Sequence, residues 1–220
     1  MRLFQDARNN KVNIASIYAR LSAAYDVPDS FLSYKTPFQL LVAVILSAQC
    51  TDAAVNRLTP SLFFQFPTIS AVATADLQDL TQAVRSINYY QTKARYIQAS
   101  ARMILSEFGG EVPHTQDQLM RLPGVGRKSA NVILSHVYHQ PAITVDTHVK
   151  RLSNRIGFVH CQDPTKIEKE LMAFWPKNIW TPMSMLLIMH GRKVCLARKP
   201  KCGVCQIREY CGYYLNCYKL

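Results

Sequence analysis

The chain has 220 residues, enough for one large domain or two small ones with a substantial hydrophobic core. Hydrophobic residues make up 49% and charged residues 18%, which excludes intrinsic disorder, and the longest apolar run, 40–46, is too short to span a bilayer. The formal net charge is +12, an excess that indicates a polyanionic partner such as nucleic acid, although a merely soluble basic protein is the alternative.

Strand signals are scarce, and apolar residues recur at helical spacing from residue 14 onwards, beginning with one face over 14–21. Thr36 followed by Pro37 is typical of a helix start and predicts a buried apolar helix to about residue 48. Thr51 or Asp52 is expected to cap the next helix. Further helices are predicted over 51–67, 76–85, 92–108, 115–121, 127–139, 147–156, 165–175 and 182–189. The pattern is that of an all-α fold.

The two ends of the chain differ in character. The N-terminus turns polar at once, as a secretory signal does not, so we expect a cytoplasmic protein without a membrane partner. Residues 141–220 carry 13 basic and 5 acidic side chains, a net of +8. This change in charge density predicts a domain boundary near residue 140.

A glycine-rich segment, 122–130, stands between two predicted helices. Gly124 and Gly126 allow a tight reversal and leave backbone N–H groups uncovered at the start of the following helix. Those amides and the positive end of the helix dipole form an anion site that a DNA phosphate fits without any base being read. An ordinary helix–turn–helix connection is the alternative, but the basic Arg127 and Lys128 favour binding of the DNA backbone.

Seven cysteines, an odd number, argue against a disulfide framework. Four of them follow the pattern C-x6-C-x2-C-x5-C and are Cys195, Cys202, Cys205 and Cys211. Four thiolates suit either tetrahedral zinc or an iron–sulfur cluster, and the spacing does not decide between them. No metal role is assigned to the remaining three.

Two further residues have both a structural and a chemical interpretation. Lys128 lies in the first turn of a predicted helix, and its spacing alone predicts that it contacts a phosphate. Asp146 lies just before a predicted helix, and its position alone predicts that it is the N-cap.

Several motifs resemble those of one family. Segment 122–130 resembles the helix-hairpin-helix of the endonuclease III family of DNA repair glycosylases. The resemblance extends through Leu-Ser-Ala-Gln-Cys-Thr-Asp at 46–52 and Val-Asp-Thr-His at 145–148 to the four C-terminal cysteines, so it covers nearly the whole chain in the family's order.

The resemblance implies an architecture and a cofactor. It implies two helical domains with the active site in the cleft between them. A six-helix barrel over 30–140 contains the hairpin, and a discontinuous domain, 1–29 with 141–220, holds a [4Fe–4S] cluster. The four cysteines of the pattern then ligate iron rather than zinc. A monomer is expected.

The resemblance also implies a reaction. Lys128 matches the family's catalytic lysine and Asp146 its catalytic aspartate, as expected of a glycosylase that is also an apurinic/apyrimidinic-site lyase. The substrate is duplex DNA with an oxidised pyrimidine or an abasic site, and the target nucleotide must be flipped out. A monofunctional glycosylase of the same fold and a non-enzymatic DNA-binding module are the alternatives, and the Lys128–Asp146 pair opposes both.

Three regions are expected to contact DNA. Gln49 matches the family's void-filling glutamine, and Tyr89 stands where the family has an aliphatic wedge, after Asn88, which is expected to adopt the positive φ of a turn. In the hairpin, contacts are predicted from Gly124, Val125, Gly126 and Arg127. Near the cysteines, the cations predicted to contact phosphate are Arg198, Lys199 and Lys201.

Overall fold

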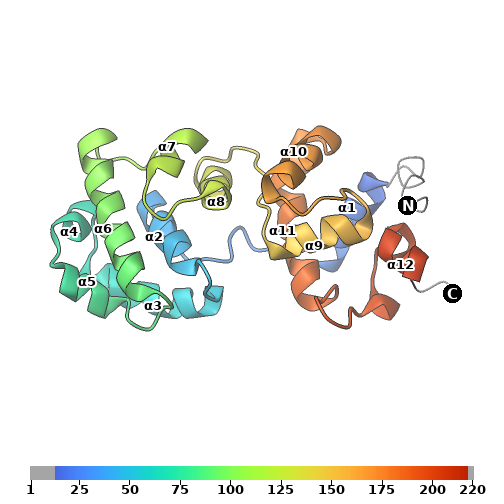
Figure 1. Ribbon diagram of the computed structural model, residues 1–220, viewed down its shortest axis with the longest axis horizontal. Coiled ribbons are helices and arrows are strands. Elements are labelled where there is room, and N and C mark those ends of the chain that lie inside the picture. The colour runs from blue at the N-terminus through green and yellow to red at the C-terminus, as the bar shows by residue number, and fades with distance from the viewer. Residues whose placement is uncertain (1–12, 218–220) are drawn as a thin grey trace. The chain divides into compact units, whose positions relative to one another are not determined.

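The structure is a computed structural model that describes residues 13–217, and throughout that range it contains helices and no β-strand (Figure 1). The prediction of an all-α fold is confirmed. The chain divides into two compact units, one over Asp29–Gln140 and the other joining the segment up to Pro28 to the chain from Pro141 onwards. No helix within 13–217 is both long and apolar enough to cross a membrane.

The contiguous unit contains seven helices among its described residues: α2 (Pro37–Ser47), α3 (Asp52–Gln65), α4 (Ile69–Thr74), α5 (Leu77–Ala83), α6 (Tyr90–Glu107), α7 (Gln116–Arg121) and α8 (Arg127–Val137). α2 packs against α3, α6 and α8, while α6 also packs against α4 and α5 (Figure 1). The core of this unit therefore forms around α2 and the long helix α6.

The sequence explains why α2 lies at the centre. Every residue over 40–46 is at most 5% exposed, as an uninterrupted apolar run requires. The hydroxyl of Thr36 caps the helix by accepting the N–H of Gln39 at 3.2 Å, and Pro37 occupies the first turn. Thr51 caps α3 in the same way, so the predicted starts of both helices are confirmed.

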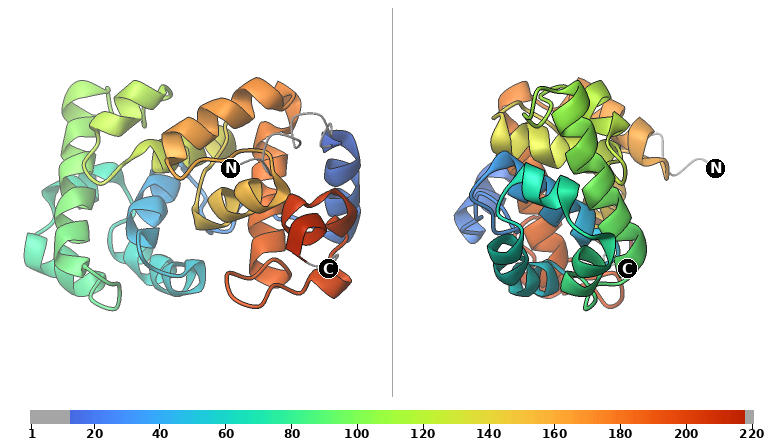
Figure 2. Two further views of the ribbon diagram at one scale, coloured as in Figure 1. Left: turned by 45° about the vertical axis from the view of Figure 1, so that its right-hand side comes forward. Right: turned by 90° about the vertical axis from the view of Figure 1, so that its left-hand side faces the viewer.

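The discontinuous unit is built from α1 (Ile14–Ala24), α9 (Thr147–Ile156), α10 (Pro164–Phe174), α11 (Trp180–Lys193) and α12 (Gly212–Cys217), with short 3-10 turns at Lys177–Ile179, Cys202–Val204 and Arg208–Tyr210. α11 packs against both α9 and α1, and α12 packs against α9. Helix α1, blue in Figure 2, thus lies among helices from the far end of the sequence.

Two helices were not predicted, α4 and α12, and each has only six residues. A helix of this length shows too little periodicity to be recognised and has too few internal hydrogen bonds to be stable alone. α4 is held by its neighbour, because Gln98 and Arg102 of α6 donate to the carbonyls of Ala75 and Ala73 at 2.7 and 2.8 Å.

Candidate functional site

The glycine-rich hairpin joins α7 to α8 as a tight turn. Gly124 has φ +82°, and the N–H of Val125 donates to the carbonyl of Leu122 at 3.1 Å. Gly126 is the N-cap of α8 and has no side chain to bond the amides of the first turn. The turn therefore has the backbone form of an anion site at a helix N-terminus.

Helix α6 supports this hairpin. The hydroxyl of Ser100 donates to the carbonyl of Pro123 at 3.1 Å, and the ring of Tyr96 packs so closely that a Cβ on Gly124 would lie 2.7 Å from it. Glycine is thus needed at position 124 for two reasons, the positive φ and the lack of space.

We expect Gly124→Ala to lower the free energy of unfolding by about 2 kcal/mol, because it adds both strain and overlap. Gly126→Ala is the matched control, since Gly126 has an ordinary negative φ and nothing within 4 Å of an added Cβ. Urea unfolding followed by circular dichroism measures both variants. Equal destabilisation by the two would show that the close contact with Tyr96 is unimportant.

The hairpin residues predicted to bind DNA differ in how far their side chains are exposed. Lys128, the second residue of α8, has an exposed side chain, and the side chain of Arg127 is partly exposed. The side chain of Val125 is only 6% exposed and belongs to the core. Val125 can therefore contribute only its backbone, whereas Lys128 presents an exposed amine in the first turn of α8.

Gln49 and Tyr89 each lie on a turn, and the two residues share the same backbone conformation. Both side chains are exposed, and both residues have left-handed backbone, with φ of 54° and 59°. The side-chain amide of Asn88 donates to the carbonyl of Gln49 at 3.0 Å and joins the two turns. The unit thereby brings together two residues that are 40 positions apart in the sequence.

The prediction that Asn88 takes the positive φ is wrong, because Tyr89 adopts it as the N-cap residue of α6. With this backbone the Asn88 side chain reaches the carbonyl of Gln49, and that tertiary hydrogen bond stabilises the turn. Left-handed backbone is uncommon for an aromatic residue and strains the chain.

Asp146 is the N-cap of α9, as predicted from its position. Its Oδ1 accepts the N–H of Val149 at 2.8 Å, and the side chain is partly exposed. α11 packs closely here, since a Cβ on Gly191 would lie 2.8 Å from Nδ1 of His148. The start of α9 is therefore firmly held, which fixes the direction of the Asp146 carboxylate.

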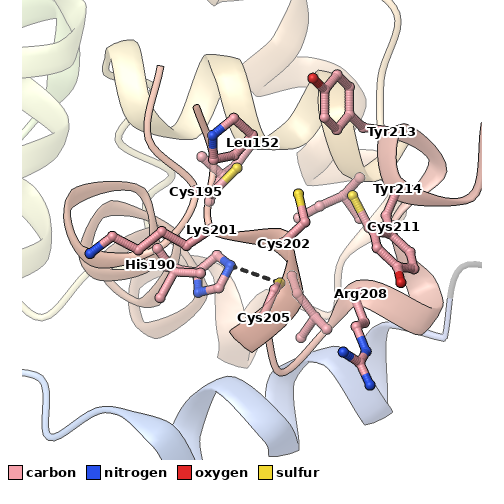
Figure 3. A pocket seen from close by; sticks show the side chains of 14 residues that line it. Leu152, His190, Cys195, Lys201, Cys202, Cys205, Arg208, Cys211, Tyr213 and Tyr214 are labelled. Carbon is pink, nitrogen blue, oxygen red and sulfur yellow. Dashed lines mark hydrogen bonds between the residues drawn. The ribbon is translucent and has the colours of Figure 1, made fainter. Parts of the chain in front are cut away.

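The four cysteines of the C-terminal pattern line one pocket (Figure 3). They come from the segment after α11 and from the turns that follow it, while apolar residues of α9, Leu152 and Ile156, form part of the wall. Burial raises the pKa of the Cys205 thiol to about 11, and burial also raises the pKa of Cys202 and Cys211, with the neighbouring thiols adding to each shift. A cationic centre that binds such thiols favours their thiolate form and opposes these shifts.

The geometry of the pocket bears on which centre fits. Within the described part of the chain, no three His, Cys, Asp or Glu side chains are grouped to share a single metal ion. Zinc holds its thiolates at about 2.3 Å from one atom, whereas an iron–sulfur cluster binds them at separate iron atoms. All four cysteines of the pattern line this one pocket, so they are placed to share one metal centre.

Two residues that contact the cysteine sulfurs were missed as site residues. Nη1 of Arg155 donates to Sγ of Cys195 at 3.4 Å, and Nε2 of His190 lies 3.4 Å from Sγ of Cys205 (Figure 3). Nδ1 of His190 is in turn 2.7 Å from the hydroxyl of Tyr25. The signal for His190 in the sequence is its position five residues before the first cysteine of the pattern.

The basic loop between Cys195 and Cys202 is anchored by its backbone. Arg155 donates to the carbonyls of Leu196 and Ala197 at 2.7 and 2.9 Å, and the N–H of Lys201 donates to Val194 at 3.0 Å. The three cations of this loop have exposed side chains: Arg198, Lys199 and Lys201. A fixed backbone with outward cations is suited to binding phosphates.

One chain thus contains a helical unit with a glycine hairpin at a helix N-terminus and a second unit with a four-cysteine pocket, a combination found in a class of DNA repair proteins. Residues 42–177 match the sequence model of the HhH-GPD superfamily of base excision DNA repair proteins. Residues 195–211, which start and end at cysteines of the pocket, match the iron–sulfur binding domain of endonuclease III.

Similar proteins identify the family. The chain is 45% identical to endonuclease III of Synechocystis sp. over 95% of its length and 96% of that protein, and 38% identical to endonuclease III of Escherichia coli K12 over 93% and 97%. Structures of a trapped endonuclease III–DNA covalent intermediate and of a non-covalent endonuclease III–DNA complex each match with a TM-score of 0.88 and 40% identity, covering 94% of this chain and 97% of theirs. The chain belongs to the endonuclease III family.

Membership defines the activity and the cofactor. The protein is a base excision repair enzyme, a DNA glycosylase and AP lyase whose partner is DNA. It carries a [4Fe–4S] cluster, which fits the four partly buried thiols of the pocket.

Proposed function

We propose that the enzyme removes oxidised pyrimidines from duplex DNA and then cuts the strand, with Lys128 as its nucleophile. The observation that carries this proposal is the exposed amine of Lys128 in the first turn of α8, directly after the anion-binding hairpin. A phosphate held by the hairpin amides would place the sugar of a flipped-out nucleotide near that amine. The 40% identical relative was captured as a covalent intermediate with DNA, which agrees with an amine nucleophile.

The reaction runs in two stages. Nζ of Lys128 attacks C1′ of the sugar, the glycosidic bond breaks, and the base leaves with a proton. The ring oxygen then takes up a proton as the sugar opens to a Schiff base. Loss of a proton from C2′ breaks the bond between C3′ and its phosphate oxygen, so the strand is cut 3′ to the lesion. Water hydrolyses the Schiff base and restores the free amine.

Asp146 stabilises the positive charge that develops on the sugar as the base departs. Its Oδ1 accepts the N–H of Val149 at the cap of α9, and this bond orients the carboxylate. The same residue thus has a structural and a chemical role.

The four pocket cysteines, Cys195, Cys202, Cys205 and Cys211, hold the [4Fe–4S] cluster. A cluster bound there would fix both ends of the basic loop between Cys195 and Cys202, and it would supply no chemistry to the steps above. Gln49 enters the gap left by the flipped nucleotide, and Tyr89 wedges the opposite strand. We further propose a monomer that works in the cytoplasm.

Borohydride reduction tests the central claim. Incubation with a thymine-glycol duplex and borohydride should yield a covalent protein–DNA adduct, because only an imine is captured. Base release without capture would favour the monofunctional alternative, and binding without release would favour a non-enzymatic module.

The metal assignment predicts that anaerobically purified protein is brown and contains close to four irons per chain. Cys202→Ser should lower the iron content and destabilise the C-terminal unit, as loss of a ligand does. Cys217→Ser is the matched control, because Cys217 is exposed and outside the pocket. Stoichiometric zinc without iron would overturn the assignment.

The basic loop predicts a steep salt dependence of binding to undamaged duplex. Changing Arg198, Lys199 and Lys201 to Ala should reduce the log–log slope by about 2 to 3 units, because each lost phosphate contact reduces it by about 0.9. A control triple variant removes three exposed lysines of the same unit: Lys166, Lys169 and Lys177. Equal slopes for the wild type and the loop variant would place the DNA footprint elsewhere.

A further inference from the structure

Lys93 is a buried cation that the proposed chemistry does not use. It lies on α6, is 4% exposed, and its Nζ donates to the carbonyls of Leu46 and Ala48 at 2.8 and 2.6 Å. Burial lowers its pKa, while the nearby Cys50 thiol opposes that shift. A lysine is rarely buried unless its charge has a specific partner. Here the partners are both backbone carbonyls.

Those carbonyls belong to the C-terminal end of α2, directly before Gln49. A helix C-terminus carries partial negative charge and unsatisfied carbonyls, so a cation is favourable there. Helices often end on a left-handed glycine, but here Gln49 takes that conformation and carries the strain of a side chain. The ammonium of Lys93 offsets this strain by binding the carbonyls of Leu46 and Ala48, the residues on which the Gln49 turn is built.

Asn88 holds the same turn from its other side. Its amide donates to the carbonyl of Gln49 at 3.0 Å, so Lys93 and Asn88 together bind three carbonyls of residues 46–49. Between Asn88 and Lys93 lies Tyr89, the N-cap of α6. The two donors therefore set the position of Gln49 relative to Tyr89.

We propose that Lys93, together with Asn88, is a positioning residue that holds Gln49 in register with Tyr89 for insertion into the DNA duplex. This inference rests on the proposed function, in which Gln49 fills the gap left by the flipped nucleotide. Lys93 touches neither DNA nor the reacting atoms and acts through the turn. A role confined to stabilising the fold would instead affect all substrates alike.

Gln98 provides the matched control. It is also a buried polar residue of α6, 5% exposed, and its amide also donates to a carbonyl at a helix C-terminus, that of Ala75 at 2.7 Å. Its target is α4 rather than the Gln49 turn. Lys93→Met and Gln98→Met thus both remove buried hydrogen bonds between α6 and the C-terminal carbonyls of another helix, two from Lys93 and one from Gln98, and only the first substitution concerns Gln49.

The experiment measures single-turnover base release from a thymine-glycol duplex and lyase cleavage of a single-stranded abasic site. We expect Lys93→Met to slow release from duplex by about 10- to 100-fold, as small misplacements do, and to leave single-strand cleavage unchanged. Asn88→Ala, at an exposed position, should show the same selective defect without disturbing the core. Gln98→Met should affect neither rate at a temperature where it remains folded.

A double-mutant cycle with Gln49→Ala separates positioning from general stability. If Lys93 acts through Gln49, adding Lys93→Met to Gln49→Ala should cause little further loss, because the interaction has already been removed. Additive losses, or equal slowing of both reactions by Lys93→Met and Asn88→Ala, would overturn the inference. Failure of the proposed function is distinguishable, since the wild type itself would then form no borohydride adduct.

Discussion

Lys128→Gln should abolish borohydride capture and reduce strand cleavage at least about 1,000-fold, because the variant has no amine to form the imine. Affinity for duplex DNA should fall only modestly, since many phosphate contacts share it. The side chain of Lys128 is exposed, so the variant should fold normally. Denaturing gels measure capture and cleavage, and a filter or anisotropy assay measures binding.

Lys166→Gln is a suitable control for that experiment. Lys166 also lies in the first turn of a helix with an exposed side chain, but on α10 of the other unit. The Lys166→Gln variant should form the covalent adduct and cleave the DNA strand like the wild type. Capture of Lys128→Gln at the wild-type yield would assign the nucleophile to a different amine.

Asp146→Asn should slow base release by about 100- to 10,000-fold while leaving the fold intact. Asparagine caps a helix about as well as aspartate, so the bond to the N–H of Val149 should persist. The substitution therefore removes the negative charge and keeps the structural role. Single-turnover release from a thymine-glycol duplex measures the effect, and lesion binding should remain.

Asp163→Asn is the matched control, because Asp163 caps α10 by accepting the N–H of Lys166 at 2.8 Å. Its release rate should equal that of the wild type. Near-normal turnover by Asp146→Asn would show that Asp146 acts only as the N-cap of α9. Loss of stability in both variants would instead show that asparagine caps these helices poorly.

Features that depend on neighbouring residues could be predicted from the sequence. The long amphipathic or apolar helices were recognisable because their periodicity extends over several turns. Caps at Thr36, Thr51 and Asp146 are local bonds between a side chain and an amide three residues ahead, and all three are confirmed. The cysteine pattern was equally clear because four ligands lie within 17 residues.

Features that depend on distant contacts could not be predicted. Nothing near Lys93 shows that its ammonium is buried against carbonyls more than 40 residues away. The contact of Arg155 with Cys195 spans 40 residues and likewise depends on how α9 packs. For the Gln49 turn, residue preferences favoured Asn88 for positive φ, but a tertiary hydrogen bond assigned that backbone to Tyr89. Tertiary contacts thus overrode a local preference.

The packing of α1 against α11 has a consequence for biosynthesis. The ribosome makes about 5–20 residues per second, so α1 emerges roughly ten to thirty seconds before α11 has been made. During that interval the unit over Asp29–Gln140 is complete and can fold, but the apolar side chains of Ile17 and Leu21, fully buried in the finished structure, have no partner helix. Until α11 is made, these apolar side chains of the nascent chain are exposed to chaperones and to aggregation, and slower synthesis lengthens that exposure.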